Sequence, residues 1–174
     1  MKSIPTLVAA LLGAALGTIH AADAAKPGNQ PNFSVAVPSS AVAVEVTLAA
    51  DKQARLPIVV GEKASEGMTA AAQTLADYLE RISGAAFTVT DGDGSAGVVV
   101  GVPEDFARLP FKTAFPGGSR GREDYLLRSA ADGVWLLGAS DLAVQHAVWD
   151  LLYRLGYRQF FPGPAWEVIP VRDP

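Results

Sequence analysis

Two stretches of the chain carry apolar residues at the spacing of an amphipathic helix. Residues 66–84 form the first, with an apolar face made by Met68, Ala72, Leu75, Leu79 and Ile82. Residues 141–155 form the second, with a matching face made by Val144, Val148, Leu151, Leu152 and Leu155. Each run has a serine before it as a candidate N-cap and a glycine after it that can end the helix: Ser65, Gly84, Ser140 and Gly156.

Between and before these helices, the apolar residues alternate or form short β-branched runs, which is typical of strands. The Asp132-Gly133 pair predicts a tight hairpin between the last two runs. We interpret the glycine-rich stretch 91–97 as a hairpin turn as well, because strands are predicted on both of its sides. The predicted strands cover residues 33–37, 42–48, 55–60, 87–90, 98–102, 125–129 and 134–138.

This order of elements predicts the fold class. Two helices that each bury one face need a common layer to pack on, and the strands provide it. We therefore expect an α+β fold, an α/β sandwich in which one mixed or antiparallel sheet carries both amphipathic helices on one face. The sandwich is assigned to residues 41–156, after a leader linker at 25–40 and before a connector at 157–174.

Residues 1–24 have the pattern of a secretory signal peptide. Lys2 precedes an apolar run from Ile4 to Ile19, and Ala22-Asp23-Ala24 fits the small-residue cleavage pattern, although cleavage after Ala21 fits too. The alternative is a membrane anchor, but the run is shorter than the roughly 20 residues of a spanning helix. We expect an exported protein, periplasmic or extracellular, with no membrane span after cleavage.

Composition removes several classes of function. The chain has 14 Lys and Arg against 18 Asp and Glu, a net charge of -4, and no basic stripe, which argues against a nucleic-acid partner. It has no cysteine. Disulfides, thiolate metal sites, a cysteine nucleophile and a lipid anchor on an N-terminal cysteine are therefore excluded.

Two glycine-rich or acidic motifs match known patterns without the context that those patterns need. Gly92 to Gly97 reads G-x-G-x-x-G, but a strand follows it instead of the helix whose N-terminus would hold a pyrophosphate. Asp91 and Asp93 resemble the start of a calcium loop. Position twelve of that loop is Val102, where a glutamate should stand. We assign no cofactor to either motif.

A serine-hydrolase arrangement is formally present in the sequence. Ser119 lies in G-x-S-x-G, and Asp141 and His146 follow it in the chain order of a hydrolase triad. However, the strand before the serine and the helix after it are missing. Asp141 is expected at a helix start, and His146 is expected on a solvated stripe with Asp150 and Arg154.

Two pairs of adjacent carboxylates, Glu104-Asp105 and Glu123-Asp124, could suggest glycosidase chemistry. Adjacent residues on a strand point to opposite faces, and both pairs fall in loops or at strand starts, so we interpret them as solvated charges. The spacing of histidine and acidic residues does not match a metal site. We assign no catalytic, cofactor-binding or metal-binding residues.

The last part of the chain resembles a known domain. Residues 124–170, DYLLRSAADGVWLLGASDLAVQHAVWDLLYRLGYRQFFPGPAWEVIP, are similar to the end of the non-catalytic N-terminal domain of α-glucuronidases and β-N-acetylhexosaminidases. The upstream segments AAAQTLADYLERISG and VVVGVPED are similar to that domain too. The resemblance covers roughly residues 40–170. It implies an α/β sandwich followed by a catalytic (β/α)₈ barrel, whose catalytic carboxylates are not in this sequence.

The resemblance leads to an expected function. The chain is expected to be the accessory domain of an exported carbohydrate-active enzyme for polysaccharide degradation, truncated before its barrel. The expected partners are that barrel, in cis or in trans, and polysaccharide. The alternative is a standalone exported module that binds carbohydrate or protein. Five aromatic residues form a candidate surface for docking the barrel or for stacking on sugars, and packing in the domain's own core is the alternative. They are Trp149, Tyr153, Phe160, Phe161 and Trp166.

Overall fold

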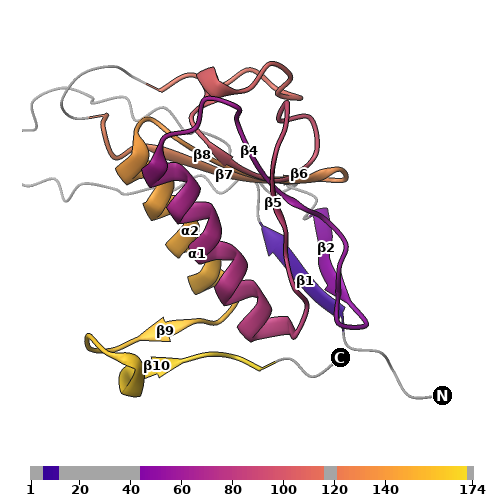
Figure 1. The fold of residues 1–174 in the computed structure, drawn as a ribbon, viewed down its shortest axis with the longest axis vertical. Coiled ribbons are helices and arrows are strands. Elements are labelled where there is room, and N and C mark those ends of the chain that lie inside the picture. Colours follow the sequence, from indigo (N-terminus) through magenta and orange to yellow (C-terminus); the bar gives the residue numbers. More distant parts are fainter. Residues whose placement is uncertain (1–5, 12–43, 116–120, 172–174) are drawn as a thin grey trace, which may run out of the picture.

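The computed structural model describes residues 6–11, 44–115 and 121–171 (Figure 1). Within these ranges, two α-helices, two short 3₁₀ helices and ten strands follow one another. Their order and bounds are β1 Thr6–Leu11, β2 Val44–Ala50, β3 Gln53–Ala54, β4 Ile58–Val60, α1 Glu66–Ser83, β5 Val89–Asp91, β6 Gly97–Gly101, η1 Pro103–Asp105, β7 Tyr125–Ala130, β8 Gly133–Gly138, α2 Asp141–Arg154, β9 Arg158–Gln159, η2 Pro164–Trp166 and β10 Glu167–Val168.

The centre of the fold is a five-stranded sheet with the order β5-β4-β6-β8-β7. Strands β5, β4, β6 and β8 are parallel, whereas β7 pairs with β8 in the antiparallel direction. The hairpin predicted at Asp132-Gly133 is present between β7 and β8. The sheet is mixed, which confirms the predicted α+β fold class.

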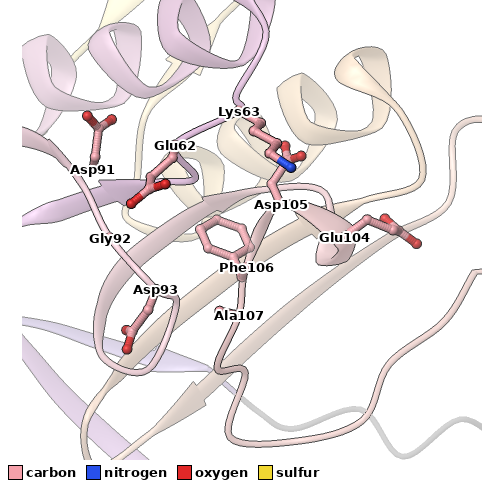
Figure 2. Close-up of a pocket in the computed structure, with 9 residues that line it drawn as sticks. All are labelled: Glu62, Lys63, Asp91, Gly92, Asp93, Glu104, Asp105, Phe106 and Ala107. Carbon is pink, nitrogen blue, oxygen red and sulfur yellow. The ribbon is translucent and has the colours of Figure 1, made fainter.

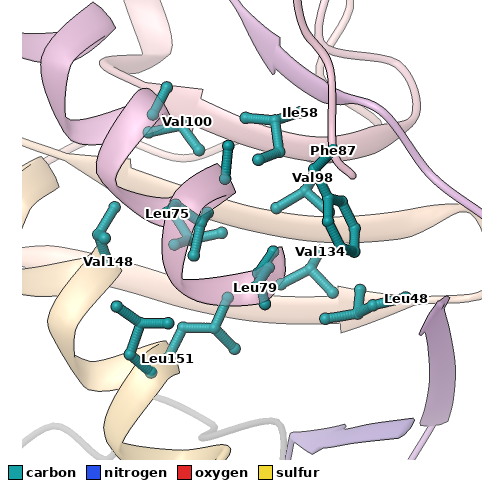
Figure 3. Packing of buried hydrophobic residues seen from close by; sticks show 14 of the residues in the cluster. Leu48, Ile58, Leu75, Leu79, Phe87, Val98, Val100, Val134, Val148 and Leu151 are labelled. Atoms are coloured by element: carbon teal, nitrogen blue, oxygen red, sulfur yellow. The ribbon is translucent and has the colours of Figure 1, made fainter. Parts of the chain in front are cut away.

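Helices α1 and α2 lie side by side on one face of this sheet (Figure 1). Both begin as the sequence predicts. The Ser65 side chain accepts a hydrogen bond from the Met68 amide at 3.1 Å, and the Ser140 side chain accepts one from the Ala143 amide at 3.3 Å. The predicted apolar faces are buried against the sheet and form the main core (Figure 3), which includes Leu48, Ile58, Leu75, Leu79, Val98, Val134, Val148 and Leu151.

The opposite face of the sheet is covered by loops. A second core lies there, made by Val59, Val99, Phe106, Trp135 and Leu137. Trp135 is fully buried, and its indole N–H donates to the carbonyl oxygen of Gly94 at 2.9 Å. The Phe111 ring meets the Trp135 ring edge-on, with 5.5 Å between the ring centroids. The loops that carry Gly94 and Phe106 therefore serve as a third layer.

The hairpin predicted at residues 91–97 is wrong. Strands β5 and β6 do not pair with each other, because both pair in parallel with β4, which lies between them. The connection crosses over β4 instead, and a Cβ atom added to Gly92 would lie 2.7 Å from Cγ1 of Val59. Gly94 and Gly97 have φ angles of 84° and 101°, which only glycine adopts readily. The glycines thus permit a close crossing.

The N-terminal strands form a separate three-stranded sheet, with the order β1-β2-β3. Strand β1 lies within the segment that the sequence analysis places outside the fold, and it pairs with β2 from Thr6↔Ala50 to Leu11↔Val44. The assignment of residues 1–24 as an export signal stays a prediction. The predicted linker at 25–40 and strand at 33–37 lie outside the described residues. In the described ranges, we find no helix with the length and apolarity to cross a membrane.

The expected connector contains structure of its own. Strands β9 and β10 form a short antiparallel hairpin, with Arg158 paired to Val168 and Gln159 paired to Glu167. We call residues 157–169 the C-terminal arm. It lies past the ends of α1 and α2, opposite the end at which both helices begin (Figure 1).

Candidate functional site

Among the described residues, an acidic hollow and the C-terminal arm are candidate surfaces for a function. The hollow has a volume of about 370 Å³ and lies at the carboxyl ends of β4, β5 and β6 (Figure 2). In open sheets with parallel strands, this edge is the usual place for ligands. The lining residues are Glu62, Lys63, Asp91, Gly92, Asp93, Glu104, Asp105, Phe106 and Ala107.

The carboxylates of the hollow do not converge on one point. The side chains of Asp91, Asp93 and Glu104 point in different directions (Figure 2). Within the ranges described, no group of three or more His, Cys, Asp or Glu residues is placed to hold a metal ion. The adjacent Glu104 and Asp105, interpreted above as solvated charges, differ in burial: Glu104 is exposed and Asp105 is half-buried.

Asp105 is a carboxylate of the hollow whose pKa is raised, whereas hydrogen bonds from Ser95 lower the pKa of Asp93. Burial raises the pKa of Asp105, and the charges of Glu104 and Asp141 raise it further, while Lys63 acts in the opposite direction. The charged form is therefore disfavoured in the folded protein relative to the unfolded chain. This penalty is present at neutral pH and disappears as the pH falls below the ordinary value of 3.8.

We accordingly expect Asp105→Asn to stabilise the domain at pH 7. The gain should be a few tenths of a kcal/mol, up to about 1, since the group is partly solvated, and it should vanish near pH 3. Urea unfolding at both pH values measures it. Asp91→Asn is the control, because Asp91 lines the hollow but does not contribute to the pKa of Asp105. An equal gain in the free energy of unfolding in both variants would contradict a burial penalty specific to Asp105.

Asp141, the acidic residue of the formal serine-hydrolase arrangement, has a structural role at a helix start. Asp141 starts α2, and its carboxylate accepts a hydrogen bond from the hydroxyl of Ser65 at 2.5 Å. It lies so close to Gly67 that an added Cβ would be 2.7 Å from its oxygen. Asp141 therefore joins the N-terminal ends of both helices, where their dipoles favour an anion. Ser119 lies outside the described residues.

The predicted stripe on α2 is present in part. The guanidinium of Arg154 pairs with the carboxylate of Asp150 at 3.0 Å, one helical turn apart. His146 is half-buried rather than freely solvated.

The five aromatic residues of the candidate docking surface are all exposed. Their exposed fractions decide that they are not core residues: Trp149 39%, Tyr153 55%, Phe160 66%, Phe161 61% and Trp166 51%. Single exposed apolar residues are ordinary in a soluble protein, but five on neighbouring elements are an uncommon concentration. Phe160, Phe161 and Trp166 all belong to the C-terminal arm.

The structure divides these residues into smaller groups. Trp149 contacts Tyr78 and Tyr157, with ring centroids 5.4 and 5.6 Å away. Phe161 and Trp166 form an edge-on pair at 5.0 Å. Tyr153 is covered by the guanidinium of Arg158, which lies 3.6 Å from the ring centroid. Of these ring contacts among the described residues, the Phe161–Trp166 pair is the one that lies entirely within the arm.

Sequence reasoning missed the residues that hold the arm in place. Tyr78 of α1 and Tyr157 of the arm both donate hydrogen bonds to Glu167. Tyr78 borders the predicted apolar face, lying three residues after Leu75 and four before Ile82. Glu167 is a single acidic residue between Trp166 and Val168. The sequence therefore indicates that Tyr78 borders an apolar helix face and that Glu167 is a charged residue in a strand. It does not indicate that the two side chains are in contact.

The comparisons with known proteins found little at the sequence level. No family model matches the chain. A search of curated proteins also found no match. Among solved structures, the GH20 β-N-acetylhexosaminidase from Streptomyces coelicolor A3(2) is similar over 65% of this chain and 20% of its own, with 23% sequence identity and a TM-score of 0.42. The chain spans about a fifth of that enzyme, and we transfer no residue role from it.

Proposed function

We propose that the chain is a non-catalytic accessory domain of an exported carbohydrate-active enzyme, of the α-glucuronidase-like or hexosaminidase-like kind. Three features support this proposal. The sequence from 124 to 170 resembles the N-terminal domain of such enzymes, the fold is the α+β sandwich that this resemblance implies, and the arm exposes aromatic side chains that the core does not use. The catalytic barrel would then be supplied in cis or by a partner chain.

The exposed Phe161–Trp166 pair carries the proposal. The domain's own core does not need this apolar pair. A neighbouring surface that covers the pair would stabilise the complex, because apolar area is removed from water. Aromatic residues of this kind are the usual anchors at protein interfaces. A barrel docked on the arm would cover them.

The coding sequence beyond Pro174 is the first test. An open frame that encodes a (β/α)₈ barrel supports docking in cis. A stop codon with no barrel sequence in any frame argues against it and leaves a partner chain as the source. The same barrel, or the partner, then provides the surface for the mutational test.

We expect the double change of Phe161 and Trp166 to serine to affect the domain only when the barrel is attached. It should lower the melting temperature of the two-domain protein by several degrees, because an interface is lost, and change the isolated domain by about 1 °C at most. Leu142→Ser is the control, since Leu142 is 46% exposed but lies at the other end of α2. Equal shifts with and without the barrel would contradict docking on the arm.

The alternative function is a standalone exported module that binds carbohydrate through the same aromatic pair. Calorimetric titration of the chain with xylan-type and amino-sugar oligomers distinguishes the two. Saturable binding that Trp166→Ser abolishes supports the module, because stacking on a sugar needs the ring. Heat that does not exceed dilution supports the accessory domain.

A further inference from the structure

We propose that Glu167 is the clamp that fixes the C-terminal arm on α1, and that loss or protonation of its carboxylate frees the arm from the helix. The inference deepens the proposed function, since the clamp sets how Phe161 and Trp166 are presented. It does not depend on that function, because the clamp is a property of this chain alone.

The arm is attached to the domain through a narrow base. It leaves α2 at Gly156, whose φ angle is 106°, and the chain returns at Pro170. A Cβ atom added to Gly156 would lie 3.2 Å from Cγ of Pro170, so the two ends of the arm meet. Between them, β9 and β10 pair over two residues each, and an isolated hairpin of this size is at best marginally stable in water. The arm therefore needs contacts with the helix layer.

Glu167 provides the polar contacts between the arm and α1, while Arg158 of the arm separately donates to the carbonyl oxygen of Tyr153 on α2 at 2.6 Å. The Oε1 atom of Glu167 accepts hydrogen bonds from the hydroxyl of Tyr78 at 2.6 Å and from the hydroxyl of Tyr157 at 3.2 Å. Its Oε2 atom pairs with the guanidinium of Arg81 at 3.1 Å. Tyr78 and Arg81 lie three residues apart on α1, so one carboxylate receives two donors from the helix and one from the arm.

The surroundings favour the charged form of this carboxylate. The hydrogen bond from Tyr78 lowers the pKa of Glu167 most, and Arg81 and Tyr157 lower it further, against the effect of burial. Burial raises the pKa of Tyr157, followed by the effects of Tyr78 and Glu167, so this phenol keeps its proton and remains a donor. Tyr78, Arg81 and Tyr157 are the titratable or charged groups that hydrogen-bond or pair with the carboxylate.

The sign of the pH dependence follows from a lowered pKa. Glu167 stabilises the clamped arm fully above its ordinary value of 4.5. This contribution is lost as the pH falls through the lower value of the folded state. The arm should thus loosen in acid before the two-helix core does.

Hydrogen exchange of the full chain tests the clamp. In Glu167→Gln, the amides of Phe160 and Trp166, which hydrogen-bond within the arm, should exchange about tenfold faster at pH 7, while those of α1 and β8 keep their protection. Glu80→Gln is the matched control, because it makes the same change at an exposed glutamate of α1, the helix that carries Tyr78 and Arg81. Tyr78→Phe removes only the shortest hydrogen bond and should have an intermediate effect.

The pH profile separates a clamp from a merely structural glutamate. In the native chain, protection in the arm, corrected for intrinsic exchange, should decrease below pH 4.5, whereas Glu167→Gln should show a flat profile. Unchanged protection of the arm in Glu167→Gln, or equal loosening of arm and core, would overturn the proposal. Neither outcome depends on a barrel, so the exchange experiment tests the clamp independently of the proposed accessory function.

Discussion

Trp135→Ala should lower the free energy of unfolding by about 3–5 kcal/mol, the usual cost of truncating a buried tryptophan. The indole is fully buried in the second core, packs on the Phe111 ring and donates its N–H to Gly94. Alanine leaves a cavity under the loops that carry Gly94 and Phe106, and it leaves the Gly94 carbonyl oxygen without this donor. Denaturant unfolding followed by far-UV circular dichroism measures the loss.

The control for this prediction is Trp166→Ala. Trp166 is about half exposed, so the same change of side chain should alter the free energy of unfolding by about 0.5 kcal/mol or less. Trp135→Phe should fall between the two, because it keeps an aromatic ring but not the N–H donor. Similar losses in Trp135→Ala and Trp166→Ala would contradict the second core.

Gly133→Ala should cost about 3 kcal/mol or more, near the upper end for overpacked sites. A Cβ atom at residue 133 would lie 2.1 Å from the carbonyl oxygen of Gly97, the residue paired with it across β6 and β8. This contact lies at the first residue pair of the two parallel strands, and a backbone oxygen there cannot rotate away as a side chain would. Thermal unfolding of the variant, or its failure to accumulate as folded protein, measures the effect.

Asp132→Ala is the control for the glycine substitution. Asp132 lies one residue earlier in the same turn, and its contribution to the β6–β8 region is a backbone carbonyl that accepts from the Gly97 amide at 3.1 Å. An alanine keeps that carbonyl, so stability should change little. A larger loss in Asp132→Ala than in Gly133→Ala would show that turn chemistry, not close approach, governs the site.

The helices could be predicted from the sequence because their signals are local. Ser65 and Ser140 lie directly before the apolar runs that they cap, and the period of those runs fixes the buried faces. The β7–β8 hairpin is local as well, since Asp132-Gly133 joins two strands that pair with each other.

The partners of the other strands could not be predicted in this way. Glycine-rich residues 91–97 between two apolar runs fit a turn equally well when the strands pair together and when a third strand lies between them. Alternation identifies a strand and its faces, but it does not identify its neighbours. The insertion of β4 is decided by the packing of the whole sheet.

The candidate site shows the same division. The sequence pointed to the exposed aromatic residues, because Trp149 and Tyr153 lie off the apolar face of α2 and the other three follow the end of that helix. It did not identify the clamp, since Tyr78 and Glu167 are separated by 89 positions. A hydrogen bond between such residues leaves no pattern in a single sequence.

The loop over β4 has a practical consequence for anyone who mutates the acidic hollow. Asp93 and Phe106 line that hollow, yet Phe106 is also part of the second core and would contact any Cβ added to Gly94 at 2.8 Å. Phe106 therefore both lines the acidic hollow and packs in the second core. A substitution in the hollow can therefore reduce ligand binding by unfolding the protein. Each variant should first be checked for a native melting curve.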